Sequence, residues 1–94
     1  MQPVRKAIVY GDVKLSVQAS AMHYSTPRID GLPLKEYTEV EVALIDAHGN
    51  FLRPSEIGIK GFDTLFESGG APVAGYVPRN KLRALRLALR RRAV

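Results

Sequence analysis

Hydrophobic positions near the end of the chain recur with the period of an α-helix. In residues 78–92 (PRNKLRALRLALRRR), Leu82, Leu85 and Leu89 fall on one stripe at about 100° per residue. Pro78 suits the first helical turn, where a missing N–H costs nothing, and the residues after it are mostly strong helix formers. The pattern therefore predicts a long C-terminal helix whose leucine stripe packs against the face of a sheet.

Residues 13–21 alternate between apolar and polar side chains with the period of a β-strand. The apolar set is Val13, Leu15, Val17, Ala19 and Ala21, and the polar set between them is Lys14, Ser16, Gln18 and Ser20. We expect the apolar set to be buried and the polar set to be exposed to solvent, as in an antiparallel sheet with one buried face. Residues 4–10 form a second β-like run, and the Gly-Asp pair at positions 11–12 predicts a hairpin turn. The register of this hairpin pairs Ile8 with Leu15 and Tyr10 with Val13.

Residues 37–46 predict a third strand, and its second half is apolar on both faces, which indicates a central position. Its alternating glutamates, Glu39 and Glu41, would lie on the wet face. Shorter segments follow: strands at 50–53 and 73–77, a weak edge strand at 56–60, and a single helical turn in 62–67 capped by Asp63. The pattern predicts an α+β fold, with an antiparallel sheet of four or five strands and the long C-terminal helix packed on one face.

Composition narrows the class of protein. The 94 residues are 46% hydrophobic, which fits one globular domain spanning residues 1–94. The chain has no cysteine, so disulfides and thiolate metal sites are excluded. No run approaches the roughly 18 apolar residues of a membrane span, and the N-terminus lacks the pattern of a signal peptide. We therefore expect a cytoplasmic protein.

The net charge of +5 is concentrated at one end of the sequence. Residues 79–94 hold seven basic residues and no acid, whereas residues 1–78 hold seven basic and nine acidic residues, a balance of −2. Arg83, Arg86 and Arg90 share i, i+3, i+7 spacing and form a second helical stripe beside the leucines. The candidate anion-binding residues are Arg79, Lys81, Arg83, Arg86, Arg90 and Arg91. The alternative is a solvated helix end that complements the macrodipole or pairs with the acids of the body.

Nucleic acid is the anionic partner that these arginines fit best, because guanidinium groups contact phosphates bidentately. Four tyrosines would stack on bases if they share a surface; they are Tyr10, Tyr24, Tyr37 and Tyr76. No helix-turn-helix, zinc-finger or RNP pattern is present, so base-specific readout is not expected. The alternative function is a small protein-binding inhibitor or adaptor, such as a phage counter-defence protein that docks an acidic protein surface. Both hypotheses leave homo-oligomerisation open.

The proline- and glycine-containing segment 23–35 is a second candidate site. His23, Tyr24 and Arg28 are a polar and aromatic set suited to holding a ligand, although a plain crossover loop has the same composition. An enzyme built on this loop would need a concave pocket containing His23 and a carboxylate. The sequence carries no catalytic motif, so we expect a non-enzymatic protein without a cofactor. His23 and His48 are 25 residues apart and lack companions at metal-ligand spacing, so no metal is expected.

Overall fold

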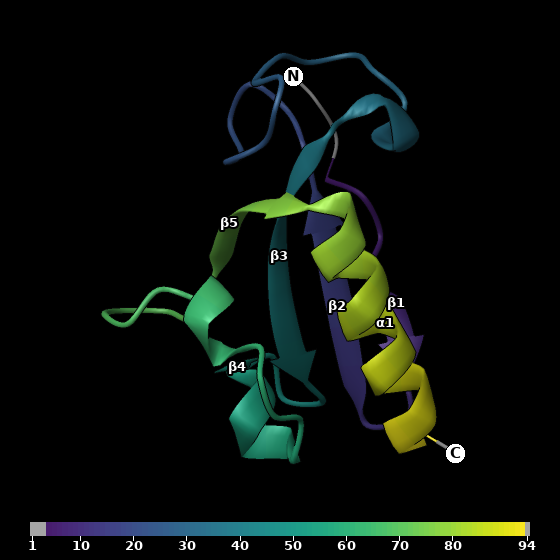
Figure 1. Ribbon diagram of the computed structural model, residues 1–94, viewed down its shortest axis with the longest axis vertical. Helices are drawn as coiled ribbons and strands as arrows, with labels where there is room; N and C mark the ends of the chain where they lie inside the picture. The colour runs from purple at the N-terminus through teal and green to yellow at the C-terminus, as the bar shows by residue number, and fades with distance from the viewer. Residues whose placement is uncertain (1–3, 94) are drawn as a thin grey trace.

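A computed structural model describes residues 4–93 as an antiparallel sheet with one long helix (Figure 1). The strands are β1 (Ile8–Tyr10), β2 (Val13–Gln18), β3 (Glu39–Asp46), β4 (Phe51–Leu52) and β5 (Ala74–Pro78), and the helix is α1 (Arg79–Ala93). Three short 3-10 helices lie in the connections: η1 (Leu34–Glu36), η2 (Pro54–Ile57) and η3 (Asp63–Leu65). This arrangement confirms the predicted α+β class, with five strands in the sheet.

Strand β3 is the centre of the sheet, as its two-sided hydrophobicity predicts. One edge of β3 pairs with β2, which pairs in turn with β1, and every pairing is antiparallel. The other edge is shared, because β5 pairs with the first half of β3 and β4 with the second half. The register of β5 shifts between Val40 and Val42, where a bulge interrupts the ladder.

The β1–β2 hairpin has the register that the sequence predicts. Ile8 pairs with Leu15 and Tyr10 pairs with Val13. Gly11 occupies the left-handed region with φ 63°, which a glycine adopts without steric cost at the first position of a two-residue turn.

Helix α1 lies across one face of the sheet and runs beside β2 (Figure 1). Leu82, Leu85 and Leu89 are buried there, as predicted, against the inward-facing side chains of β2 and β3. Those strand residues are Val13, Leu15, Val17, Val40, Val42 and Leu44. Each fully buried leucine contributes about 1.5–3 kcal/mol of hydrophobic stabilisation. The helix begins at Arg79 rather than Pro78, because Pro78 still pairs with Glu39 as the last residue of β5.

The prediction that the polar face of β2 is wet is wrong at Gln18 and Ser20, which are both buried. The Gln18 side chain serves as a strand partner: its amide nitrogen donates to the Arg5 carbonyl at 2.7 Å, and its oxygen accepts from the Arg5 N–H at 2.9 Å. The strand ends at Gln18, and Ala21 is exposed in the loop that follows. The hydrogen bonds to backbone groups satisfy the polar atoms of the side chain itself, so the side chain can be buried although the alternation predicts that it is exposed.

The predicted edge strand at 56–60 is also wrong. Residues Pro54–Ile57 form η2, and Gly58 ends it in the left-handed region with φ 79°. Asp63 does not cap its own helical turn, because its carboxylate accepts hydrogen bonds from the Ser55 N–H at 2.9 Å and from the Ser55 hydroxyl. The Asp63 side chain therefore links η3 to η2. A capping pattern, which considers only the residues of one helical turn, does not predict this contact.

Three aspartates tie surface turns together, and hydrogen bonds lower the pKa of each carboxyl. The donors are the Arg92 side chain for Asp12, the Asn50 N–H for Asp46 and the Ser55 hydroxyl for Asp63. A carboxyl with a lowered folded-state pKa stabilises the fold above the unfolded pKa of about 3.9, and this stabilisation is lost as the pH falls through the folded value.

We therefore expect the urea midpoint to fall as the pH is lowered below about 4. The triple variant Asp12→Asn, Asp46→Asn and Asp63→Asn is expected to be less stable than the wild type at pH 7 and to have a flatter pH profile. Urea titrations between neutral and acid pH measure both quantities. If the variant loses stability at acid pH as steeply as the wild type does, carboxyls other than these three are responsible for the loss.

Candidate nucleic-acid interface

One flank of α1 carries four arginines in a single stripe. Arg79, Arg83, Arg86 and Arg90 follow i, i+4, i+7, i+11 spacing, which keeps them within a narrow arc of the helix. With Leu82 and Leu87 they line a shallow groove of about 450 Å³, and none of its lining residues is acidic. Leu87 is 42% exposed and adds an apolar side chain to the lining of this groove.

Two arginines of the stripe also hold the fold together. The Arg79 guanidinium donates to the carbonyls of Leu34 and Tyr37, with 2.8 Å between Nε and the Tyr37 oxygen. Arg86 Nε donates to the Tyr10 hydroxyl at 2.8 Å. All of these acceptors are neutral, so both arginines keep a full positive charge at the groove while their side chains are fixed in place.

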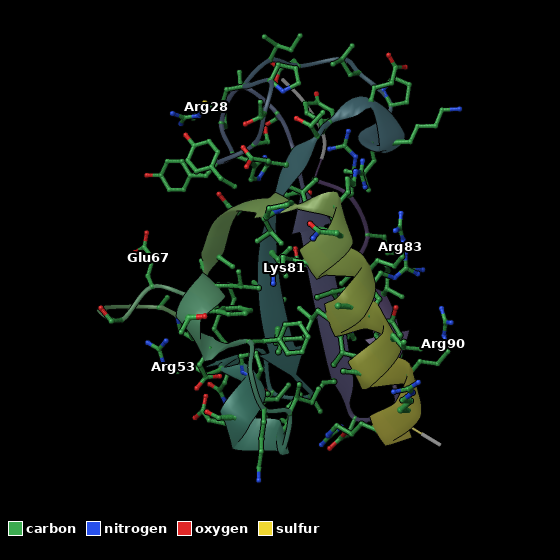
Figure 2. All side chains as sticks on the ribbon, viewed as in Figure 1. Arg28, Arg53, Glu67, Lys81, Arg83 and Arg90 are labelled. Atoms are coloured by element: carbon green, nitrogen blue, oxygen red, sulfur yellow. The ribbon has the colours of Figure 1, made fainter. Side chains whose placement is uncertain are left out.

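The other two arginines, Arg83 and Arg90, are exposed and make no hydrogen bond or ion pair within residues 4–93. Figure 2 shows both side chains extending to the same side of the molecule, away from the sheet. Their α-carbons are about 10 Å apart along the helix axis, given a rise of 1.5 Å per residue. Arg83 and Arg90 are thus the groups of the stripe that are available to an external anion.

The remaining cationic residues of α1 lie outside the stripe. Lys81 extends from the opposite flank of the helix, over the sheet (Figure 2). Arg91 is exposed but is rotated by about 100° from Arg90 and about 80° from Arg83. Arg92 pairs with Asp12 at 2.6 Å and donates to the Ile57 carbonyl at 2.8 Å, and the Asp12 hydrogen bond raises its pKa. Arg92 therefore pins the end of the helix to the β1–β2 turn.

The acids of the body do not neutralise the stripe. Within residues 4–93 the one salt bridge is that between Arg92 and Asp12. Glu39 accepts from the Thr26 hydroxyl at 2.7 Å, and Glu41 accepts from the Tyr24 N–H at 2.9 Å. The two glutamates thus bind the 23–35 loop instead of the helix.

The loop brings Tyr24 and Arg28 together, whereas the His23 side chain contacts Ser20 instead. The Arg28 guanidinium carbon lies 5.0 Å from the centre of the Tyr24 ring, and Arg28 Nε donates to the His23 carbonyl at 3.1 Å. The His23 side chain contacts Ser20, with 2.7 Å between Nδ1 and Oγ. Because Ser20 is completely buried, this contact stabilises the loop and offers no accessible nucleophile. Residues 4–93 contain no group of three His, Cys, Asp or Glu side chains that could hold a metal ion.

The four tyrosines do not share one surface. Tyr10 and Tyr37 are buried, whereas Tyr24 and Tyr76 are exposed and their ring centres lie 5.7 Å apart. In Figure 2, Arg28 and Arg53 lie on the opposite side of the view from Arg83 and Arg90. Arg28 and Arg53 therefore do not extend the α1 stripe into one continuous patch. The sequence did not predict the pairing of Tyr76 with Tyr24. The sequence feature most closely related to this pairing is the glycine at position 75, directly before Tyr76.

The fold and the groove define a small α+β protein with a cationic helical flank. Comparisons of the chain with known protein families, with curated proteins and with solved structures give no match. Among residues 4–93, no helix has the length and apolar character needed to cross a bilayer.

Proposed function

We propose that this protein is a non-enzymatic binding module whose α1 stripe docks the phosphates of a nucleic acid. The observation that carries the proposal is that Arg83 and Arg90 extend in the same direction, without partners among the described residues, from a groove that lacks acidic residues. Arginine suits this task because its planar guanidinium meets phosphate oxygens bidentately and stays charged at every physiological pH.

The length of the stripe supports contact with several phosphates. Eleven residues separate Arg79 from Arg90, which corresponds to about 16 Å along the helix. Arg79 and Arg86 are held by neutral acceptors, so they add fixed positive charge to the two free guanidiniums. Among the described residues α1 is the one α-helix, so it does not belong to a helix-turn-helix that would place it in the major groove. Contacts to the backbone of the nucleic acid, with little base specificity, are the expected outcome.

The sheet face opposite α1 favours a second candidate, a protein-binding inhibitor or adaptor. Val9, Lys14, Ile45 and Phe51 are consecutive cross-strand neighbours, so they form one row on that face. Val9 is 61% exposed and Phe51 is 43% exposed. Exposed apolar side chains in one row are typical of a protein contact. Recovery of a stoichiometric protein partner that is lost in Val9→Lys/Phe51→Lys would favour this candidate.

The primary proposal is tested by the salt dependence of binding to DNA and RNA. If all four arginines contact phosphates, log K should fall with log salt with a slope of about −3 to −4. Fluorescence anisotropy with labelled duplex and single-stranded oligonucleotides, from low to high salt, measures this slope. Undetectable binding at low salt, or binding that salt does not weaken, would contradict the proposal.

A further inference from the structure

Two exposed tyrosines from distant parts of the chain form a pair beside Arg28. Tyr24 lies in the 23–35 loop and Tyr76 lies in β5; their ring centres are 5.7 Å apart and their planes are inclined by 31°. Each side chain is 45% exposed. Paired aromatic rings at a protein surface present flat apolar area that is fixed at low entropic cost.

The backbone is arranged to hold this pair. Tyr76 has a φ of 52°, in the left-handed region that a residue with a bulky side chain rarely adopts. Its N–H donates to the Tyr24 carbonyl at 2.9 Å, which ties the two segments together. At Gly75 an added Cβ would lie 2.9 Å from the Tyr24 Cβ, so only glycine permits this approach. Disfavoured backbone that is held by surrounding contacts is a feature of binding sites.

Arg28 adds a positive charge to the aromatic pair. Its guanidinium carbon lies 5.0 Å from the Tyr24 ring centre, and its Nε–H is directed to the His23 carbonyl, which is neutral. Arg28 makes no salt bridge within residues 4–93, and the carboxylates that contact this loop, Glu39 and Glu41, accept hydrogen bonds from Thr26 and Tyr24. The cluster thus combines stacking surface with a cation that forms no salt bridge.

We propose that Tyr24, Tyr76 and Arg28 form a stacking platform for an unpaired base of single-stranded nucleic acid. A base would stack on the tyrosine rings, and Arg28 would meet the phosphate next to it. This inference rests on the proposed function and names its substrate class. Duplex bases are stacked on one another and are not accessible to the rings, so the platform selects single strands.

The platform is connected to the α1 stripe through the chain itself. Tyr76 precedes Arg79 by three residues, and β5 leads directly into α1 (Figure 1). Arg28 and the Arg83–Arg90 side of the stripe lie on opposite sides of the view in Figure 2. In that view β5 and the N-terminal end of α1 lie between the two groups, so binding to the platform and the stripe together requires a longer oligonucleotide than either alone.

Tyr76→Gly tests the platform without straining the fold, because it removes the ring and leaves a residue suited to φ 52°. In anisotropy titrations at low salt, we expect this variant to bind an oligothymidine of about 20 nucleotides about 5- to 100-fold more weakly than the wild type. Affinity for a duplex of the same length should not change. The matched control is Phe51→Ala, which removes an exposed aromatic ring away from the platform and should leave both affinities unchanged.

The results separate this inference from the proposed function. If the wild type shows salt-dependent binding but Tyr76→Gly keeps the full single-strand affinity, the platform proposal is wrong, whereas the proposed function of the α1 stripe is retained. If the wild type binds neither probe, the proposed function fails, and the platform fails with it. Circular dichroism establishes that Tyr76→Gly is folded; should it not be, Tyr76→Asn supplies a second ring deletion that tolerates the left-handed backbone. Quenching of tyrosine fluorescence by the single strand supports the platform, because the other two tyrosines, Tyr10 and Tyr37, are buried and the chain has no tryptophan.

Discussion

Reversing two charges, Arg83→Glu with Arg90→Glu, is expected to weaken nucleic-acid binding by on the order of 10- to 100-fold at low salt. Both side chains are exposed and have no partner within residues 4–93, so their loss removes phosphate contacts without breaking an internal contact. The slope of log K against log salt should become shallower by about 1.4–1.8, because two counterion-releasing contacts are lost. Anisotropy titrations across a salt series measure both effects.

The matched control is Lys81→Glu with Arg91→Glu. These residues lie on the same helix and give the same change in net charge, but they are outside the stripe: Lys81 extends from the opposite flank (Figure 2), and Arg91 is rotated away from Arg90 by about 100°. Their reversal should have a smaller effect and should change the salt slope less. Equal losses in the two variants would mean that the helix acts only through its total charge. Arg79 and Arg86 are unsuitable for this comparison, because each also donates a structural hydrogen bond.

Truncation of the central leucine of the helix, Leu85→Ala, is expected to cost about 2–5 kcal/mol of unfolding free energy. Leu85 is completely buried between α1 and the sheet, so its truncation removes apolar contacts and leaves a cavity. Domains of this size have about 5–14 kcal/mol of stability in total, so the loss is a large fraction. The melting temperature should fall by about 10–25 °C. Guanidinium titration with circular dichroism measures the change.

Leu87→Ala is the control for this truncation, because Leu87 is on the same helix but lies at the groove. Its substitution should change the unfolding free energy by no more than about 0.5 kcal/mol. Comparable destabilisation by the two changes would contradict the packing of α1 described above. Because Leu87 lines the groove beside the arginines, the same variant also shows whether an apolar contact contributes to binding.

The architecture follows closely from the order of hydrophobic residues. A buried stripe at Leu82, Leu85 and Leu89 and the alternation along β2 leave few alternatives to a sheet covered by one helix. The β1–β2 register follows from a two-residue turn, which is a local rule. The strand prediction for residues 56–60 failed because local capping at η2 outweighs their alternation: Arg53 N–H donates to the Glu56 carboxylate at 2.6 Å, and Gly58 ends the turn. The prediction of Asp63 as a cap failed because its carboxylate accepts from Ser55 instead.

The candidate site was predicted only in part. Helical periodicity places Arg83, Arg86 and Arg90 on one flank, and the structure adds Arg79 to the same stripe. The sequence gives no sign that Arg92 is paired with Asp12, eighty residues earlier in the chain. The tyrosine pair depends on contacts across more than fifty residues, which no spacing in the sequence encodes.

By itself, the sequence determined the class of fold, the buried face of the helix and the cationic character of its flank. These follow from composition and from periodicities of 2 and 3.6 residues, which act over neighbouring positions. The tertiary structure alone decided which arginines are free, which are committed to the fold, and which tyrosines meet at the surface. Those outcomes depend on donors and acceptors that folding brings together from distant segments, so they exist only once the chain has packed.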